Sequence, residues 1–180
     1  MDGVDIREWD VYALRRRIGI VPQDVFLFAG DIATNVGLGR VSSAVIDQAI
    51  VDANAANFIA SLPEGLRQSV VERGISFSAG QRQLLAFARA LAAAPDILVL
   101  DEATANIATT TEEDIQAGVD KLMQGRTSIA VAHRLSTIRS ADQILVMHNG
   151  QICERGQHDE LLAVHGLYYR LHAMQYDNLR

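Results

Sequence analysis

The stretch Ile97-Leu98-Val99-Leu100-Asp101-Glu102 decides the fold, because it joins an unbroken apolar run directly to two acids. Four apolar residues without polar alternation are typical of a strand buried on both faces, as in a parallel sheet covered by helices. The carboxyl end of such a strand faces the crevice where open α/β sheets bind ligands. Asp101 is therefore placed to orient a magnesium ion, and Glu102 to polarise a water for attack on a phosphate. A purely structural role for the two acids is equally open from this stretch alone.

Strand and helix signals alternate along the rest of the chain. Further strands are expected at 17–21, which Pro22 ends, at 127–131, a second buried strand, and at 143–147. Helices are expected at about 43–62, 80–94, from Thr110, 135–140, 158–164 and 167–176. Asn149-Gly150 predicts a two-residue hairpin after the last strand. This order predicts an α/β fold, a parallel sheet with helices on both faces and a hairpin at its edge.

Composition limits the classes of protein that remain. The chain has 180 residues, of which 49% are hydrophobic and 21% charged, as expected for one globular domain with its own core. Its formal net charge of −6 gives no electrostatic reason to expect a nucleic-acid partner. The single cysteine, Cys153, excludes an intrachain disulfide and a thiolate zinc cage. No stretch approaches the roughly 20 apolar residues of a spanning helix, so a membrane link has to come through a partner or a further segment.

The lysine content settles one further point. A phosphate-binding loop of the form G-x-x-x-x-G-K-[ST] needs a lysine followed by a hydroxyl residue. The only lysine is Lys121, and Leu122 follows it. The 180 residues therefore contain no such loop.

Three more positions are candidates for chemistry, each with a plain structural alternative. Ser78-Ala79-Gly80-Gln81 begins the alanine-rich helix, where free amides can bind an anion, although serine is also an ordinary helix cap. His133 follows the strand at 127–131, a position that a hydrogen-bonded structural histidine also occupies. Gln23 follows the first strand and Pro22, where a glutamine with no special role is common.

The order and spacing of these stretches resemble the nucleotide-binding domain of ATP-binding-cassette (ABC) transporters over essentially the whole chain. Residues 20–24 resemble the Q-loop of that family, 78–83 its signature, 98–104 its Walker B strand, and 132–137 its switch-histidine loop. The exporter type is indicated by three stretches that resemble exporter sequences: Val25–Gly30, Glu72-Arg73-Gly74, which in exporters contacts the membrane domain, and the ending from Gly156.

The resemblance implies a P-loop NTPase-like fold with a helical signature subdomain at about 26–94, the remainder of 1–180 being the catalytic core. It implies ATP and Mg²⁺ as ligands, with Glu102 and His133 catalytic, and Gln23 and Asp101 serving the metal. Ser78, Ala79, Gly80 and Gln81 would hold the γ-phosphate bound by an opposite subunit. The partners implied are a second nucleotide-binding domain and the transmembrane domain of the exporter, at the cytoplasmic face of a membrane such as the bacterial inner membrane, with no nucleic acid.

The chain also departs from the family pattern. It begins at a point after the phosphate loop, so we expect an N-terminally truncated domain with apolar faces left uncovered. Ala79 stands where the family mostly has glycine, and Ala108 where it usually has aspartate. The main hypothesis is the ATP-hydrolysing segment of an ABC exporter. The alternatives are a truncated, non-hydrolytic remnant or regulatory half-cassette that cannot bind ATP alone, and a soluble cassette ATPase of DNA repair or translation.

Overall fold

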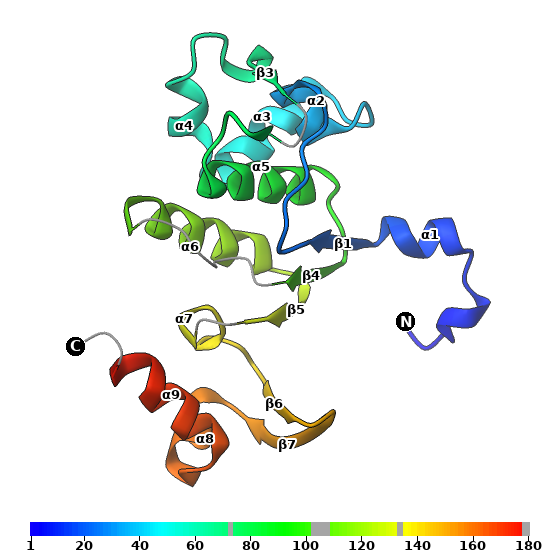
Figure 1. Cartoon of the computed structure of the whole chain (residues 1–180). Helices are drawn as coiled ribbons and strands as arrows, with labels where there is room; N and C mark the ends of the chain where they lie inside the picture. The colour runs from blue at the N-terminus through cyan, green and yellow to red at the C-terminus, as the bar shows by residue number, and fades with distance from the viewer. Residues whose placement is uncertain (72–73, 102–108, 133–134, 178–180) are drawn as a thin grey trace. The chain divides into compact units, whose positions relative to one another are not determined.

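The computed structural model describes residues 1–71, 74–101, 109–132 and 135–177. It divides into two compact units, unit 1 at Met1–Val131 and unit 2 at Ala132–Arg180 (Figure 1). The predicted boundary of a helical subdomain at about 26–94 is a division within unit 1, and it stays a prediction.

A three-stranded parallel sheet is the centre of unit 1. Its order is β1 (Ile18–Val21), β4 (Ile97–Asp101) and β5 (Thr127–Val131), so β4 is the middle strand. The register aligns Val21 with Leu100 and Leu100 with Ala130. The predicted α/β class with a parallel sheet is confirmed, and so are the three predicted strand positions within one residue.

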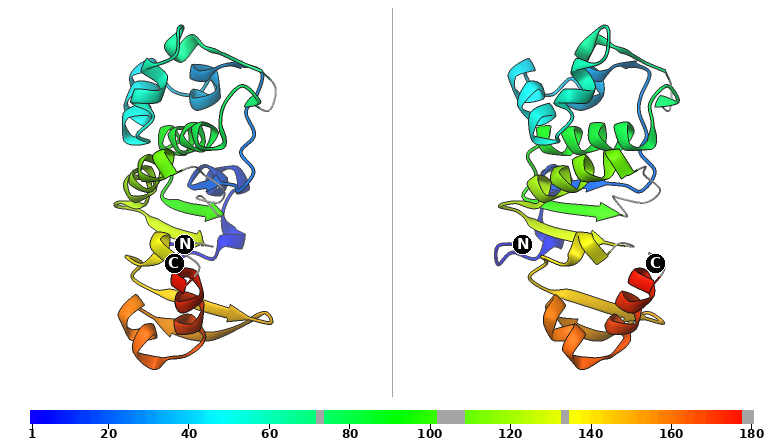
Figure 2. Two further views of the ribbon diagram at one scale, coloured as in Figure 1. Left: turned by 60° about the vertical axis from the view of Figure 1, so that its left-hand side comes forward. Right: turned by 90° about the vertical axis from the view of Figure 1, so that its left-hand side faces the viewer.

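Helices form a layer against this sheet. Unit 1 contains α1 (Val11–Arg16), α2 (Ile32–Gly37), α3 (Ser43–Asp52), α4 (Ala56–Ala60), α5 (Ala79–Ala92) and α6 (Thr109–Met123), with short 3₁₀ turns η1 (Ile6–Glu8) and η2 (Gly65–Arg67). α5 and α6 lie side by side on one face of the sheet (Figures 1 and 2). Their side chains Leu85, Phe87, Ile115 and Val119 are fully buried in the core that also contains Leu98.

The helix predicted over 43–62 is wrong as a single element. The structure has two helices there, separated at Asn54, whose φ of +58° ends α3. The N–H of Ala55 donates to the carbonyl of Ile50 at 3.0 Å, as in a Schellman helix end, where asparagine tolerates the left-handed conformation. Asn54 was thus a stop signal that the apolar periodicity concealed.

The prediction that 127–131 is a buried strand is also wrong. β5 is the last strand of the three, and its apolar side chains Ile129 and Val131 are 57% and 53% exposed. They lie on the face of the sheet opposite α5 and α6, together with Ile20 of β1, since strand residues alternate between faces.

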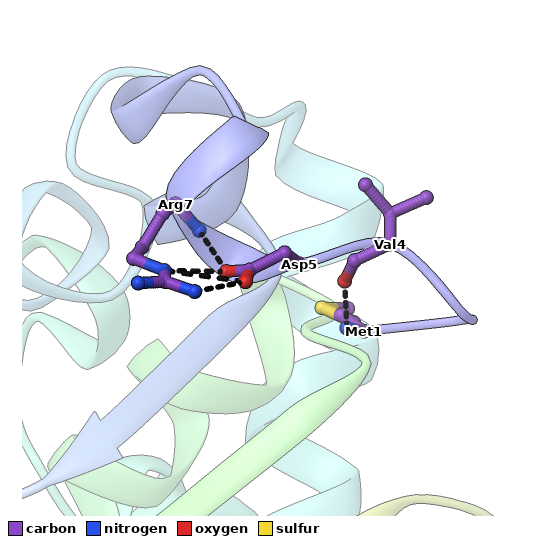
Figure 3. Close-up of polar contacts among 4 residues, drawn as sticks. All are labelled: Met1, Val4, Asp5 and Arg7. Atoms are coloured by element: carbon purple, nitrogen blue, oxygen red, sulfur yellow. Dashed lines mark hydrogen bonds and ion pairs between the residues drawn. The ribbon is translucent and has the colours of Figure 1, made fainter.

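Two local features complete unit 1. β2 (Gly30–Asp31) and β3 (Ser69–Val70) form a short antiparallel pair. At the start of the chain, Asp5 accepts hydrogen bonds from the backbone N–H and the guanidinium of Arg7, while the terminal amine of Met1 donates to the carbonyl of Val4 (Figure 3). These contacts are all between neighbours in sequence and exposed, so they order only the chain start.

Unit 2 is built on the predicted hairpin. β6 (Ile144–His148) and β7 (Gln151–Gly156) pair antiparallel around Asn149-Gly150, both of which have positive φ as a type I′ turn requires. Its helices are α7 (Leu135–Ile138), α8 (His158–Val164) and α9 (Leu167–Asp177). The carboxylate of Glu154 accepts the N–H groups of Leu167 and Tyr168 and so caps α9. Tyr168 is buried, and its hydroxyl is 2.7 Å from Nδ1 of His158.

Candidate functional site

The carboxyl edge of the parallel sheet contains two of the predicted site positions, Gln23 and Asp101. Asp101 is the last residue of β4, and Gln23 follows the end of β1 by two residues. Because β1 and β4 are parallel neighbours, both residues belong to the same edge, and both are exposed. Glu102 directly follows Asp101, and His133 follows the end of β5 by two residues, but both lie outside the described residues. An exposed amide and an exposed carboxylate are the oxygen donors that Mg²⁺ accepts.

The described residues form no preformed cluster of metal ligands that would support the prediction of a metal site. Within the described parts of the chain, no group of three or more His, Cys, Asp and Glu side chains lies close enough to hold a metal ion. Mg²⁺ usually keeps several waters and takes few protein ligands together with substrate phosphates, so Gln23 and Asp101 remain suitable donors.

The predicted signature forms the first turn of α5. Ser78 Oγ accepts the N–H of Gln81 at 3.2 Å, and Gln81 Oε1 accepts the N–H of Ser78 at 2.9 Å, which is a complete capping box. Ser78 is therefore a helix cap, which is the structural role that the sequence analysis gave as the alternative to anion binding. The N–H groups of Ala79 and Gly80 have no acceptor among the described residues. The exposed amide of Ala79, at the positive end of the helix dipole, is therefore available to an anion.

Ala79 fits its position without strain. It is the first residue of α5 and is absent from the residues with positive φ. A helical φ is open to every L-residue, so the restriction that alanine places on positive φ has no effect here. Ser78 and Ala79 are exposed, while Gly80 is buried.

The signature turn and the sheet edge lie toward the same end of unit 1. α5 runs into β4 through a short connection, so helix and strand point in opposite directions. The first turn of α5 and the carboxyl end of β4 are consequently at the same end (Figure 2).

Sequence reasoning missed a polar cluster inside unit 1. Arg89 of α5 donates from Nε to the carbonyl of Asn35 at 2.8 Å, from Nη1 to the carbonyl of Phe26 at 3.0 Å, and from Nη2 to Oδ1 of Asn35 at 3.1 Å. Burial lowers the pKa of the Arg89 guanidinium. The composition of α5 could have indicated this cluster, because Arg89 is the one charged residue in the apolar stretch between Leu84 and Ala92.

An exposed apolar surface adjoins this cluster. Phe26 and Phe28 are 43% and 51% exposed, and their rings meet edge to face at 5.1 Å. Leu27 between them is fully buried, and a Cβ on Gly74 would lie 2.6 Å from its Cδ1. Gly74 therefore packs against the 26–28 segment, which brings the ends of two exporter-like stretches together. The other two residues of the second stretch, Glu72 and Arg73, lie outside the described residues.

Comparison with known proteins identifies the family. The sequence profile described as "ABC transporter" matches residues 1–105, more than half of the chain. The chain belongs to the ABC transporter family.

Individual relatives are similar over nearly the whole chain. An ATP-dependent lipid A-core flippase of Pseudomonas fluorescens is 49% identical over 180 residues, and a protein of Bacillus subtilis named "Probable multidrug resistance ABC transporter ATP-binding/permease protein YheH" is 48% identical over 177 residues. These alignments cover 98% and 97% of this chain but only 30% and 26% of the relatives. The chain thus spans less than a third of the length of the curated relatives it matches.

A solved structure supports the fold. A bacterial Atm1-family ABC exporter with ATP bound matches with a TM-score of 0.87 and 44% sequence identity, covering 97% of this chain and 31% of that one. Membership of the family implies ATP binding. In the part of the chain that the structure describes, no helix is long and apolar enough to cross a membrane.

Proposed function

We propose that this chain is the ATP-hydrolysing segment of an ABC exporter and couples ATP hydrolysis to transport across a membrane. The observation that carries the proposal is the parallel sheet β1-β4-β5, because its register puts Asp101 at the end of β4 on the same edge as the end of β1, which Gln23 follows. The family assignment and the exporters among the relatives support it.

Each candidate site residue has a chemical role in this proposal. Gln23 and Asp101 would hold Mg²⁺, which offsets the negative charge of the phosphates when it is bound. Glu102 would orient and deprotonate the attacking water, and His133 would steady the γ-phosphate and that water by hydrogen bonding. Positioning and electrostatics supply most of the acceleration in phosphoryl transfer, so the placement of Asp101 at the end of the central strand β4 suits this role.

The signature turn would act on the nucleotide of a second domain. Ser78 and Ala79 are exposed, and the amides of Ala79 and Gly80 suit a phosphate oxygen. We therefore propose a second nucleotide-binding domain as partner, with Ser78, Ala79, Gly80 and Gln81 facing its γ-phosphate.

The membrane domain would contact the aromatic surface at Phe26 and Phe28. Two exposed aromatic rings beside buried Leu27 form an apolar surface of the kind that interfaces use. This contact would hold the chain at the cytoplasmic face of the membrane.

The phosphate loop has to come from outside these 180 residues, because Lys121 is the only lysine and Leu122 follows it. Isothermal titration with ATP and Mg²⁺ tests this arrangement. We expect the 180-residue chain by itself to bind ATP with a Kd weaker than about 1 mM, and the complete exporter to bind it in the micromolar to millimolar range. Equal, weak binding by both would favour a non-hydrolytic half-cassette over the proposed function.

A further inference from the structure

The inference begins with Asn35, a polar side chain that is 1% exposed in α2. Its Oδ1 accepts the N–H of Phe28 at 2.8 Å, and its Nδ2 donates to the carbonyl of Phe28 at 2.8 Å and to the carbonyl of Asp31 at 2.9 Å. Arg89 supplies the fourth bond, to Oδ1. Asn35 thus uses both donors and both acceptor positions of its amide, and two of the four bonds hold the backbone of one residue, Phe28.

Arg89 of α5 binds the same segment. Its guanidinium donates to the carbonyl of Phe26, and it lies 5.6 Å from the ring centroid of Phe28. The bonds from Arg89 to Asn35 span 54 residues of sequence. Asn35 and Arg89 together therefore fix the backbone at both ends of Phe26–Phe28, which we call the aromatic segment.

A charged residue is a costly choice for packing alone. Burial lowers the pKa of Arg89, and no carboxylate of the described residues lies within ion-pair distance of its guanidinium. An apolar side chain of similar volume could fill the space without desolvating a charge. What only arginine offers is a planar fork that reaches two backbone carbonyls and an amide oxygen at once, and lysine, with a single ammonium, does not reproduce that fork.

The aromatic segment faces outward on one side and is tied to the signature helix on the other. Phe26 and Phe28 are exposed, whereas Leu27 packs against Gly74. Arg89 and Ser78 belong to one continuous element, α5 with its cap, about 16 Å apart along the helix axis at 1.5 Å per residue. Hydrogen bonds therefore join the aromatic segment to the helix whose first turn is the predicted signature.

We propose that Asn35 and Arg89 are positioning residues that couple the exposed aromatic segment to the signature end of α5. This inference rests on the proposed function, in which the aromatic segment meets the membrane domain and the signature meets ATP. Neither residue is among the predicted nucleotide-site residues. Both set how often the signature adopts its productive position, so they affect turnover more than ATP affinity.

The test uses the complete exporter in lipid nanodiscs, carrying Arg89→Lys or Asn35→Ala. The controls are Arg40→Lys and Asn57→Ala, which change the same residue types at exposed positions. Two quantities are measured: kcat and KM for MgATP, and hydrogen–deuterium exchange of peptides covering 24–35 and 79–92. We expect kcat to fall about tenfold with KM changed less than twofold, faster exchange in 24–35 alone, and controls equal to the wild type.

Several outcomes would overturn the inference. These are a kcat within twofold of the wild type, a KM that rises in step with the loss of kcat, or exchange that rises equally in both peptides, which indicates a general loss of stability. If Arg89→Lys fails to fold, Asn35→Ala and Asn35→Ser decide by the same criteria. If the wild-type exporter has no ATPase activity, the proposed function is contradicted. The hydrogen–deuterium exchange of peptide 24–35 then still tests whether Asn35 and Arg89 hold the aromatic segment in place.

Discussion

The two faces of the parallel sheet in unit 1 have similar side chains and opposite environments. On the face beneath α5 and α6, Val21, Leu98 and Leu100 are at most 1% exposed. On the other face, Ile20 is 64% exposed and Ile129 57%. The apolar side chains of β1 and β4 are therefore buried on the covered side of the sheet, whereas those on the other side range from half-buried to exposed.

The difference shows that an apolar stretch of sequence predicts burial but does not tell which elements of the fold bury it. The run at 97–100 is apolar on both faces, and only the helical layer decides which face contributes to the core. Each buried Å² of apolar surface contributes about 25 cal/mol, so the covered face should contribute more to the stability of unit 1 than the other face does. Three substitutions test this contrast, and the expected effects decrease from the first to the last.

Leu98→Ala should have the largest effect. Leu98 is fully buried among side chains of the core, so truncation loses its transfer free energy and leaves a cavity. We expect the free energy of unfolding to fall by about 2 to 5 kcal/mol. Urea unfolding followed by circular dichroism measures this, and a loss below about 1 kcal/mol would contradict tight packing of the covered face.

Asp31→Ala should have an intermediate effect, because it removes the cap of α2, which packs on α5. Asp31 Oδ1 accepts the N–H of Thr34 at 2.6 Å, and its loss should cost about 1 kcal/mol. The hydroxyl and the N–H of Thr34 lower the pKa of the Asp31 carboxyl, so the cap is fully present above its unfolded pKa of about 3.9 and is lost as pH falls through the lower folded value. Unfolding measured between pH 7 and pH 3 should therefore show wild type and Asp31→Ala converging toward the acid end, and a difference that stays constant would refute the cap.

Ile129→Thr should have the smallest effect, since Ile129 belongs to the open face and threonine suits a strand equally well. We expect a change within about 0.5 kcal/mol, as for ordinary surface substitutions. The same urea titration measures it, preferably in parallel with Leu98→Ala. A loss comparable with that of Leu98→Ala would mean that the open face contributes to the core, and the comparison of faces would fail.

Much of the fold could be predicted from local signals. The strand at 97–101, the helix over 79–92 and the hairpin at Asn149-Gly150 follow from periodicity and turn chemistry, which involve near neighbours only. The exposure of Ile129 could not be predicted, because burial depends on which elements cover a strand.

For the candidate site, the sequence predicted where Asp101 and the signature turn stand in the fold, whereas the roles of the site residues stay predictions. Asp101 and the signature turn lie where a strand end and a helix start require, whereas the Arg89–Asn35 bonds join residues 54 positions apart with no shared motif. Such contacts become visible only once the helices are packed.

The central proposal is that this chain, within a complete exporter, supplies Glu102 as the base of ATP hydrolysis, and one measurement tests it most directly. Steady-state ATP hydrolysis by the complete exporter is compared between the wild type, Glu102→Gln and the exposed control Glu64→Gln. The account predicts a turnover at least about 100-fold lower for Glu102→Gln, the scale of a general base, with ATP binding retained and the control unchanged. A near-normal rate in Glu102→Gln would contradict it.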